Sequence, residues 1–116
     1  MKRIIPLAVV FFKEPVTGNE PVKEWFKLLE KKDRKLMGHD LLFLQENWPI
    51  GKPYVDSLGK GLWELRSKLS NRIARVIFVA KNNKIIALHA FIKKTQKTPP
   101  NEIAIALKRL KEVDIT

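Results

Sequence analysis

The stretch "LWELRSKLSNRIARVIFVAKNNKIIALHAFI", residues 62–92, decides the fold of this chain. Apolar and polar side chains alternate along much of it, and a period of two is typical of β-strands. Ser70-Asn71 and Asn82-Asn83 interrupt the pattern, and asparagine tolerates the positive φ that a two-residue hairpin turn requires. The stretch therefore predicts a meander of three antiparallel strands, over residues 62–69, 73–80 and 84–92.

Two segments before the meander carry apolar residues at helical spacing. The first begins after Asn19, a residue type that caps helices, and has Pro21 in its first turn. The second begins near Asp33 and ends before Pro49, because proline cannot continue a helix. In both segments the apolar residues recur every three or four positions and form one stripe: Val22, Trp25, Phe26 and Leu29, then Met37, Leu41, Leu44 and Trp48.

Two more strands and a last helix complete the pattern. The run Ile4–Phe12 is β-rich; a signal peptide is the alternative, but Pro6 interrupts the run and no small-residue cleavage site follows it. Tyr54–Leu58, inside a loop rich in proline and glycine, is a candidate short strand. Beyond Thr98, the expected N-cap, the period becomes helical again, with an apolar face formed by Ile103, Ala106, Leu107 and Leu110.

The order of elements is a strand, two helices, the meander and a helix. Because strands and helices are segregated, the pattern predicts an α+β fold with a small, mostly antiparallel, twisted sheet. We expect one domain over residues 1–116, a length that suits a single core. We also expect the helices to cover one face of the sheet, which leaves the other face open to solvent or to a ligand.

The composition is strongly basic. The chain has 23 Lys and Arg residues against 12 Asp and Glu residues, a formal net charge of +11. Such a charge predicts attraction to a polyanion, such as nucleic acid, an acidic membrane surface or an acidic protein. The lack of cysteine excludes disulfides and thiolate metal sites and favours a reducing cytoplasm. No apolar stretch approaches the roughly 20 residues that span a bilayer, so we expect no insertion in a membrane.

Two arginines lie on adjacent strands of the predicted meander. Arg66 shares one strand face with Glu64 and Lys68, and Arg75 lies in the middle of the next strand. A buried, unpaired arginine is costly, so Arg75 either reaches solvent at the sheet edge, pairs with Glu64, or forms an anion site with Arg66. The last alternative is attractive because the arginine fork can bind a phosphate through two hydrogen bonds.

The stretch "KKTQKTPP", residues 93–100, places Lys93, Lys94 and Lys97 just before the last helix. The N-terminus of a helix is the positive end of its dipole, and acidic residues stabilise it. Lysines there are poor stabilisers, but they would suit a clamp for a polyanion. The alternative is that they are solvent-exposed charges that only increase solubility.

The sequence contains few other candidate groups. His89 is predicted to lie on the third strand of the meander, where a hydrogen-bonded structural role and a role in the site are both open. The two histidines of the chain lack metal-ligand spacing, and phosphate-binding glycine motifs are missing. We therefore expect neither a metal nor a cofactor.

Several segments together resemble a known family. "NEPVKEWFKLL" near the start, then "GLWELR", "RVIFVA" and "ALHAFIKKTQKTP" followed by a short helix, are similar in this order to HigB-type toxins of the RelE/ParE superfamily, in the branch of phage-derived proteins. The resemblance extends from about Phe11 to Leu110. It implies a compact RelE-like toxin of a type II toxin–antitoxin pair that enters the ribosomal A site and cuts mRNA there. It also implies an antitoxin partner, HigA-like, with a helix-turn-helix domain.

The resemblance further implies a basic catalytic face. Its catalytic residues would be Arg66, Arg75, Lys93 and Lys94. The residues expected to bind RNA around them are Lys60, Lys68, Arg72, Lys97 and His89. Some relatives have a tyrosine where this chain has Phe78, and no tyrosine follows Tyr54. The general acid and base therefore stay open, with Lys93 or Lys94 as a candidate for proton transfer.

Two other functions fit the same sequence. A ParE-like inhibitor of DNA gyrase would share the fold without nuclease chemistry. A non-catalytic module that binds nucleic acid or an antitoxin would need only the net charge of +11. The intact "KKTQKTP" segment favours the nuclease.

Overall fold

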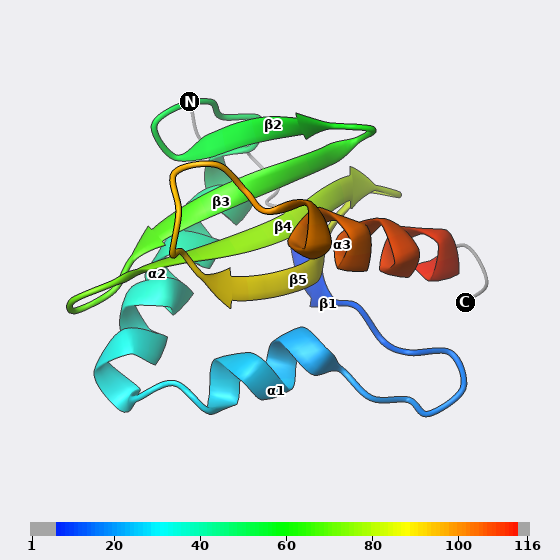
Figure 1. Cartoon of the computed structure of the whole chain (residues 1–116), viewed down its shortest axis with the longest axis horizontal. Coiled ribbons are helices and arrows are strands. Elements are labelled where there is room, and N and C mark those ends of the chain that lie inside the picture. Colours follow the sequence, from blue (N-terminus) through cyan, green and yellow to red (C-terminus); the bar gives the residue numbers. More distant parts are fainter. Residues whose placement is uncertain (1–6, 114–116) are drawn as a thin grey trace.

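The computed structural model describes residues 7–113 (Figure 1), so the beginning of the expected first strand, residues 4–6, lies outside this range. The described residues form five strands and three helices. In chain order these are β1 (Ala8–Phe11), α1 (Pro21–Lys27), α2 (Lys31–Asn47), β2 (Val55–Gly59), β3 (Leu62–Lys68), β4 (Ile73–Lys81), β5 (Lys84–Ile92) and α3 (Pro100–Val113).

The strands form one sheet in the order β1-β5-β4-β3-β2. β2 to β5 are antiparallel neighbours, and β1 pairs with β5 in parallel. The predicted α+β fold with a mostly antiparallel sheet is therefore confirmed. The candidate short strand before the meander exists as β2, so the meander has four strands instead of three.

Helices lie on both faces of the sheet, so the expectation that they cover only one face is wrong. α1 and α2 pack on the first face, where buried residues such as Met37 and Leu44 meet Leu65 and Phe78. α3 packs on the second face, mainly against β5 and β4 (Figure 1). The physical reason is visible in β4, whose run from Ala74 to Val79 is buried without alternation, since a strand with two apolar faces needs cover on both.

A β-bulge in β5 turns an extra residue toward α3. Ile77 of β4 pairs with His89, whereas the next residue, Phe78, pairs with Ala87. Leu88 is therefore the unpaired residue, and a bulge of this kind disturbs the alternation of side chains. Leu88 packs in the core cluster beneath α3, and His89 contacts Glu102 of the same helix.

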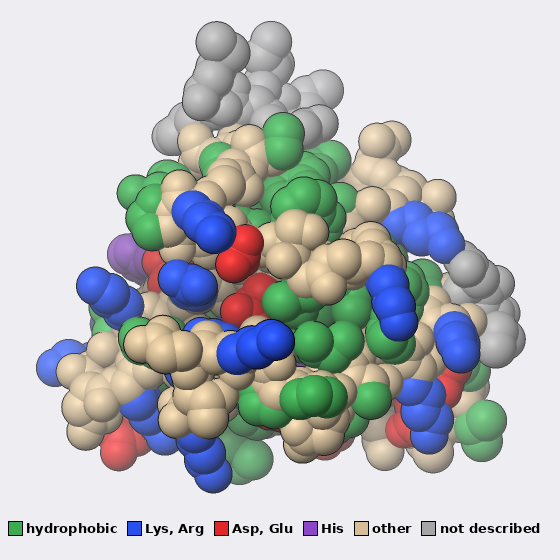
Figure 2. Space-filling view, turned by 45° about the horizontal axis from the view of Figure 1, so that its top comes forward, with side chains coloured by type: hydrophobic (Ala, Val, Ile, Leu, Met, Phe, Trp, Pro, Cys, Tyr) green, Lys and Arg blue, Asp and Glu red, His purple; other side chains and the backbone are tan. Residues whose placement is uncertain are grey.

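α3 leaves part of the second face open. The open part lies toward the end of β3, where Arg66 and Lys68 are exposed. Figure 2 views the molecule from this side and shows acidic side chains near the centre with Lys and Arg side chains around them. Among residues 7–113, no helix has the length and apolar character required to cross a membrane.

Candidate nucleic-acid interface

The chain leaves β5 through residues 93–99, which we call the basic loop, and then enters α3 (Figure 1). Its first residue stays tied to the sheet, because the Lys93 amide donates a hydrogen bond to the Ile73 carbonyl over 2.8 Å. Within the loop, the Thr95 hydroxyl donates to the Lys97 carbonyl over 2.7 Å. These bonds give the lysine-rich segment a defined path over the sheet.

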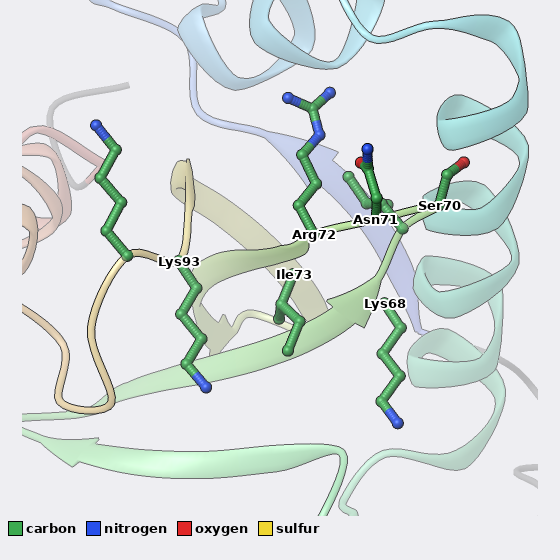
Figure 3. A pocket seen from close by; sticks show the side chains of 8 residues that line it. Lys68, Ser70, Asn71, Arg72, Ile73 and Lys93 are labelled. Atoms are coloured by element: carbon green, nitrogen blue, oxygen red, sulfur yellow. The ribbon is translucent and has the colours of Figure 1, made fainter.

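Four basic residues line an open depression of about 510 Å³ beside this loop. They come from the two sides of the β3–β4 turn and from the start of the loop: Lys68, Arg72, Lys93 and Lys94. Figure 3 shows the side chains of Lys68 and Lys93 extending to the same side, whereas Arg72 extends to the other. We call this place the cationic depression, because none of the residues that line it is acidic.

The β3–β4 turn that forms one wall of the depression is attached to α2 by Asp33. The Asp33 carboxylate accepts hydrogen bonds from the Ser70 amide at 3.0 Å and the Ser70 hydroxyl at 2.7 Å. It also forms an ion pair of 3.4 Å with Arg72. The bonds from Ser70, with a smaller contribution from Arg72, lower the pKa of Asp33 below its usual value. Arg72 is thus partly neutralised and held toward α2.

A buried ion pair lies beneath the basic loop. The side chains of Arg75 and Glu64 are only 1% and 2% exposed, and Nη1 of Arg75 lies 3.4 Å from Oε1 of Glu64. Of the alternatives for Arg75, the pairing with Glu64 is the one that the structure has. The Arg75 Nε has no hydrogen-bond partner among the described residues.

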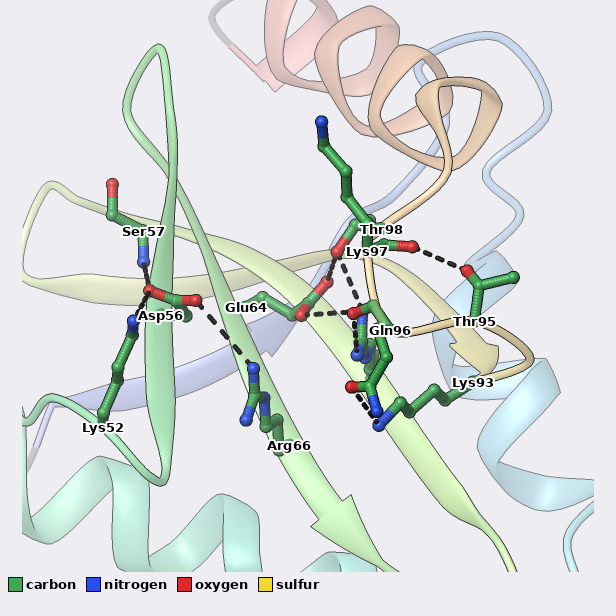
Figure 4. Close-up of polar contacts among 11 residues, drawn as sticks. Lys52, Asp56, Ser57, Glu64, Arg66, Lys93, Thr95, Gln96, Lys97 and Thr98 are labelled. Carbon is green, nitrogen blue, oxygen red and sulfur yellow. Dashed lines mark hydrogen bonds and ion pairs between the residues drawn. The ribbon is translucent and has the colours of Figure 1, made fainter.

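The same pair is hydrogen-bonded to the basic loop, and Figure 4 shows Glu64 beside Thr98 of the loop. Arg75 donates to the Gln96 carbonyl over 2.7 Å and to the Thr98 hydroxyl over 3.0 Å. The Thr98 hydroxyl in turn donates to Oε2 of Glu64 over 2.5 Å. We call Glu64, Arg75 and Thr98 the buried triad. It binds the loop by a charge-assisted network that is shielded from water.

Thr98 was expected to cap the last helix, and this expectation is wrong. α3 begins at Pro100, and the carbonyl of Pro99 accepts the first amide bonds, from Glu102 and Ile103. The Thr98 side chain is 7% exposed because it turns inward to the buried pair. A buried carboxylate and guanidinium offer a hydroxyl stronger partners than the backbone amides of an exposed helix end.

Arg66 has a different environment from Arg75, although the two are register partners on β3 and β4. Its side chain is 41% exposed, and its nearest acidic partner, Asp56 of β2, lies 3.9 Å away. An exposed ion pair at this distance contributes little free energy. The guanidinium of Arg66 therefore remains available to an anion from solution.

A second hollow, of about 300 Å³, lies between β2, β3 and the basic loop. We call it the mixed cleft, because both acidic and basic side chains line it. Its lining includes Asp56, Glu64, Arg66, Arg75, Gln96 and Lys97. Sequence reasoning missed Asp56 and Gln96; the signal for Asp56 was its place on a short strand that pairs with the strand of Arg66.

Two of the expected RNA-binding residues lie apart from this group. Lys60 is in the β2–β3 turn, at the opposite end of β3 from Lys68, roughly 25 Å away along the strand. His89 lies beneath α3, where its Nε2 is 3.0 Å from Glu102 and its Nδ1 is 3.4 Å from Arg109. Burial lowers the pKa of His89, which fits a neutral ring that donates to Glu102 and accepts from Arg109.

The arrangement can bind and polarise an anion. Arg66 and Lys68 are exposed, Lys93 is half-buried, and together they form a basic rim on the open part of the sheet face. The buried triad fixes the loop that carries Lys93. Among residues 7–113, no group of three or more His, Cys, Asp or Glu side chains could hold a metal ion. The basic rim itself can supply fixed positive charge and, through lysine, proton transfer.

Comparison with known families gives one match. The model of a family described as "Phage derived protein Gp49-like (DUF891)" matches residues 24–111, which is more than half of the chain. The matched segment contains the second half of α1, all of α2, the whole antiparallel meander, the basic loop and most of α3. No curated protein matches the chain.

Proposed function

The chain belongs to the Gp49-like family of phage-derived proteins, a RelE-like family of toxins from toxin–antitoxin pairs, and we propose that it is a HigB-type, ribosome-dependent mRNA endoribonuclease. The family indicates an antitoxin as partner. In this proposal the antitoxin carries a helix-turn-helix domain, and residues 1–116 act as one toxin domain in the cytoplasm, where the ribosome and mRNA are its targets.

One observation carries the proposal. A lysine-rich loop is held over the sheet by two buried side chains, because Arg75 and Glu64 bind its Thr98 hydroxyl and Arg75 also binds its Gln96 carbonyl. Ordering a loop costs conformational entropy. A buried charged network that offsets this cost suggests that the fixed position of the loop matters for function. The loop places Lys93 on the same side as Lys68, and Arg66 lies exposed on the same strand as Lys68. This group of cations, with Arg66 and Lys68 exposed and Lys93 half-buried, supports the binding of an RNA backbone.

The proposed reaction uses the nucleophile that RNA itself carries. The 2′ oxygen attacks the adjacent phosphorus, the bond to the 5′ oxygen breaks, and the products are a 2′,3′-cyclic phosphate and a 5′ hydroxyl. Arg66 stabilises the additional negative charge on the phosphorane. A base must take the 2′ proton and an acid must supply a proton to the 5′ oxygen; Lys93 or Lys94 serves in one of these transfers.

Arg75 has a positioning role in this proposal. It was expected to bind the phosphate directly, but its guanidinium lies 1% exposed against Glu64, Thr98 and Gln96. It acts on the substrate through the basic loop, whose position over the sheet it determines. Arg66, Lys93 and Lys94 remain the residues that contact RNA, with Lys68 and Lys97 beside them.

The test is primer extension on a reporter mRNA with purified protein, with and without translating ribosomes. We expect cuts at codon-related positions only when ribosomes translate the message. Cuts in the absence of ribosomes would identify a free ribonuclease instead. No cuts in either reaction would contradict the proposal, and a gyrase supercoiling assay would then test the ParE-like alternative.

A further inference from the structure

We propose that the mixed cleft is a subsite that reads one RNA base, and that Asp56 selects bases with an exocyclic amino group. This inference rests on the proposed function, because it assigns a part of the substrate to a defined part of the same face. The ligand is a single nucleobase: adenine, cytosine or guanine, in preference to uracil.

The cationic depression and the mixed cleft, which both border the basic loop, differ in charge, and this difference assigns their ligands. The cationic depression is lined by Lys68, Arg72, Lys93 and Lys94 without an acidic residue, which suits the phosphates of the backbone. The mixed cleft contains the Asp56 carboxylate in addition to cations. A carboxylate repels a phosphate, whereas it accepts hydrogen bonds from the amino groups of bases.

The cleft also has the size and the walls of a base pocket. Its volume of about 300 Å³ is at the small end of the range for ligand sites. Leu58 of β2 and Ile103 of α3 line it and supply apolar contacts to a flat ring. Arg66 and Lys97 lie in the same lining, where they can pair with the phosphates on either side of the bound nucleotide.

The Asp56 carboxylate keeps acceptor capacity for a ligand. Its Oδ1 accepts the amide of Ser57 over 3.0 Å. Its ion pairs with Lys52 and Arg66 are both 3.9 Å long, too long for hydrogen bonds. With its side chain 34% exposed, the Oδ2 atom can therefore accept a bond from an amino group that enters the cleft.

The pairing of β2 with β3 fixes the position of the Asp56 carboxylate. Asp56 pairs in register with Glu64, so its side chain projects from the same face of the sheet. Glu64 cannot read a base itself, because Arg75 and Thr98 occupy its two oxygen atoms. The cleft thus has one acidic group held away from the ligand and one that faces it.

The test measures binding of short RNAs by fluorescence anisotropy at constant salt, without ribosomes. The probes are an all-uridine hexamer and three hexamers in which one central uridine is replaced by A, C or G. We expect the wild-type protein to bind at least one of the amino-bearing probes about tenfold more tightly than the all-uridine probe. Equal affinity for all four probes would overturn the inference.

Two variants with the same change of charge separate recognition from general electrostatics. Asp56→Ala removes the acceptor, so the preference should disappear while the affinity for the all-uridine probe stays equal or increases. Asp40→Ala removes an equal charge on the opposite face, where Asp40 accepts a bond from Ser67, and should keep the preference. A preference that survives in Asp56→Ala would also overturn the inference.

The outcomes distinguish this inference from the proposed function. If the wild-type protein prefers amino-bearing probes but primer extension shows no ribosome-dependent cuts, the nuclease proposal fails and the base subsite stands. If the cuts occur but the wild-type protein does not distinguish the probes, the nuclease proposal stands and the base subsite fails.

Discussion

The two arginines that face each other across β3 and β4 have opposite surroundings. Arg75 is 1% exposed and bound to Glu64, Thr98 and the carbonyl of Gln96, whereas Arg66 is 41% exposed with its nearest carboxylate 3.9 Å away. Residue type and strand position are the same for both. The difference teaches that the neighbouring segments determine the role: the basic loop covers one arginine and leaves the other at the surface.

The largest effect should come from separating the buried pair. Glu64→Ala leaves the charge of Arg75 buried without its partner, and we expect the free energy of unfolding to fall by about 3–5 kcal/mol. Arg66→Ala removes an exposed arginine from the same strand and should change stability by less than about 1 kcal/mol. Urea denaturation of both variants measures the contrast, and similar losses in the two would contradict it.

The next effect concerns cleavage. Arg66→Ala should reduce the rate of ribosome-dependent cleavage by about 100-fold, as expected when a donor to the transition state is lost.

Thr98→Val, which removes the hydroxyl between Glu64 and Arg75, should reduce the cleavage rate through disorder of the basic loop. Thr98→Ser keeps the hydroxyl and should restore most of the rate. If Thr98→Val cleaves at the wild-type rate, and if hydrogen exchange shows that the amides of its basic loop stay protected, the triad does not position the loop.

A smaller effect should appear in the salt dependence of RNA binding. Each phosphate contact contributes about −0.7 to the slope of log K against log salt for a single strand. Lys93→Ala and Lys68→Ala should each make the slope less steep by about this amount, because both residues line the cationic depression. Lys60→Ala, at the other end of β3, is the matched control and should leave the slope unchanged. An equal change in slope for Lys60→Ala and Lys93→Ala would show that RNA binding depends on the total charge and not on phosphate contacts in the cationic depression.

The smallest expected effect is a dependence of stability on pH. Burial lowers the pKa of His89 below 6.5, so the unfolded chain binds more protons than the folded one in the interval between the two pKa values. The contribution of His89 to stability is then full above pH 6.5 and declines as the pH falls toward the folded pKa. His89→Gln should make the midpoint of urea denaturation depend less on pH between pH 7 and 5. A substitution of the exposed His39 should leave this pH dependence unchanged. The same decline in both variants would contradict the buried state of His89.

Much of the fold could be predicted from the sequence because its signals are local. The strands of the meander begin and end within about one residue of the predicted bounds, since alternation and the Asn82-Asn83 turn are short-range features. The cover on the second face was missed, although "IARVIFVA" is a continuous apolar run that indicates burial on both sides. Alternation alone assigns a residue to a face but does not say what covers that face.

The candidate site was predictable in its composition but not in its organisation. The sequence singled out Arg66, Arg75 and the lysines of the loop from charge and resemblance. The inward role of Thr98 depends on Glu64, 34 residues earlier in the chain, and no local pattern contains that contact. Asp56 was missed for the same reason, because only the register of β2 with β3 brings it beside Arg66.

The most direct test of the central claim is quantitative primer extension with translating ribosomes, comparing the wild type, Lys93→Ala and Lys60→Ala. Both substitutions remove one positive charge, and only Lys93 belongs to the basic loop that the buried triad positions. We predict ribosome-dependent cuts with the wild type and with Lys60→Ala, at rates within about twofold, and at least about tenfold slower cutting with Lys93→Ala. Equal rates for all three proteins, or the absence of cuts with the wild type, would contradict the account.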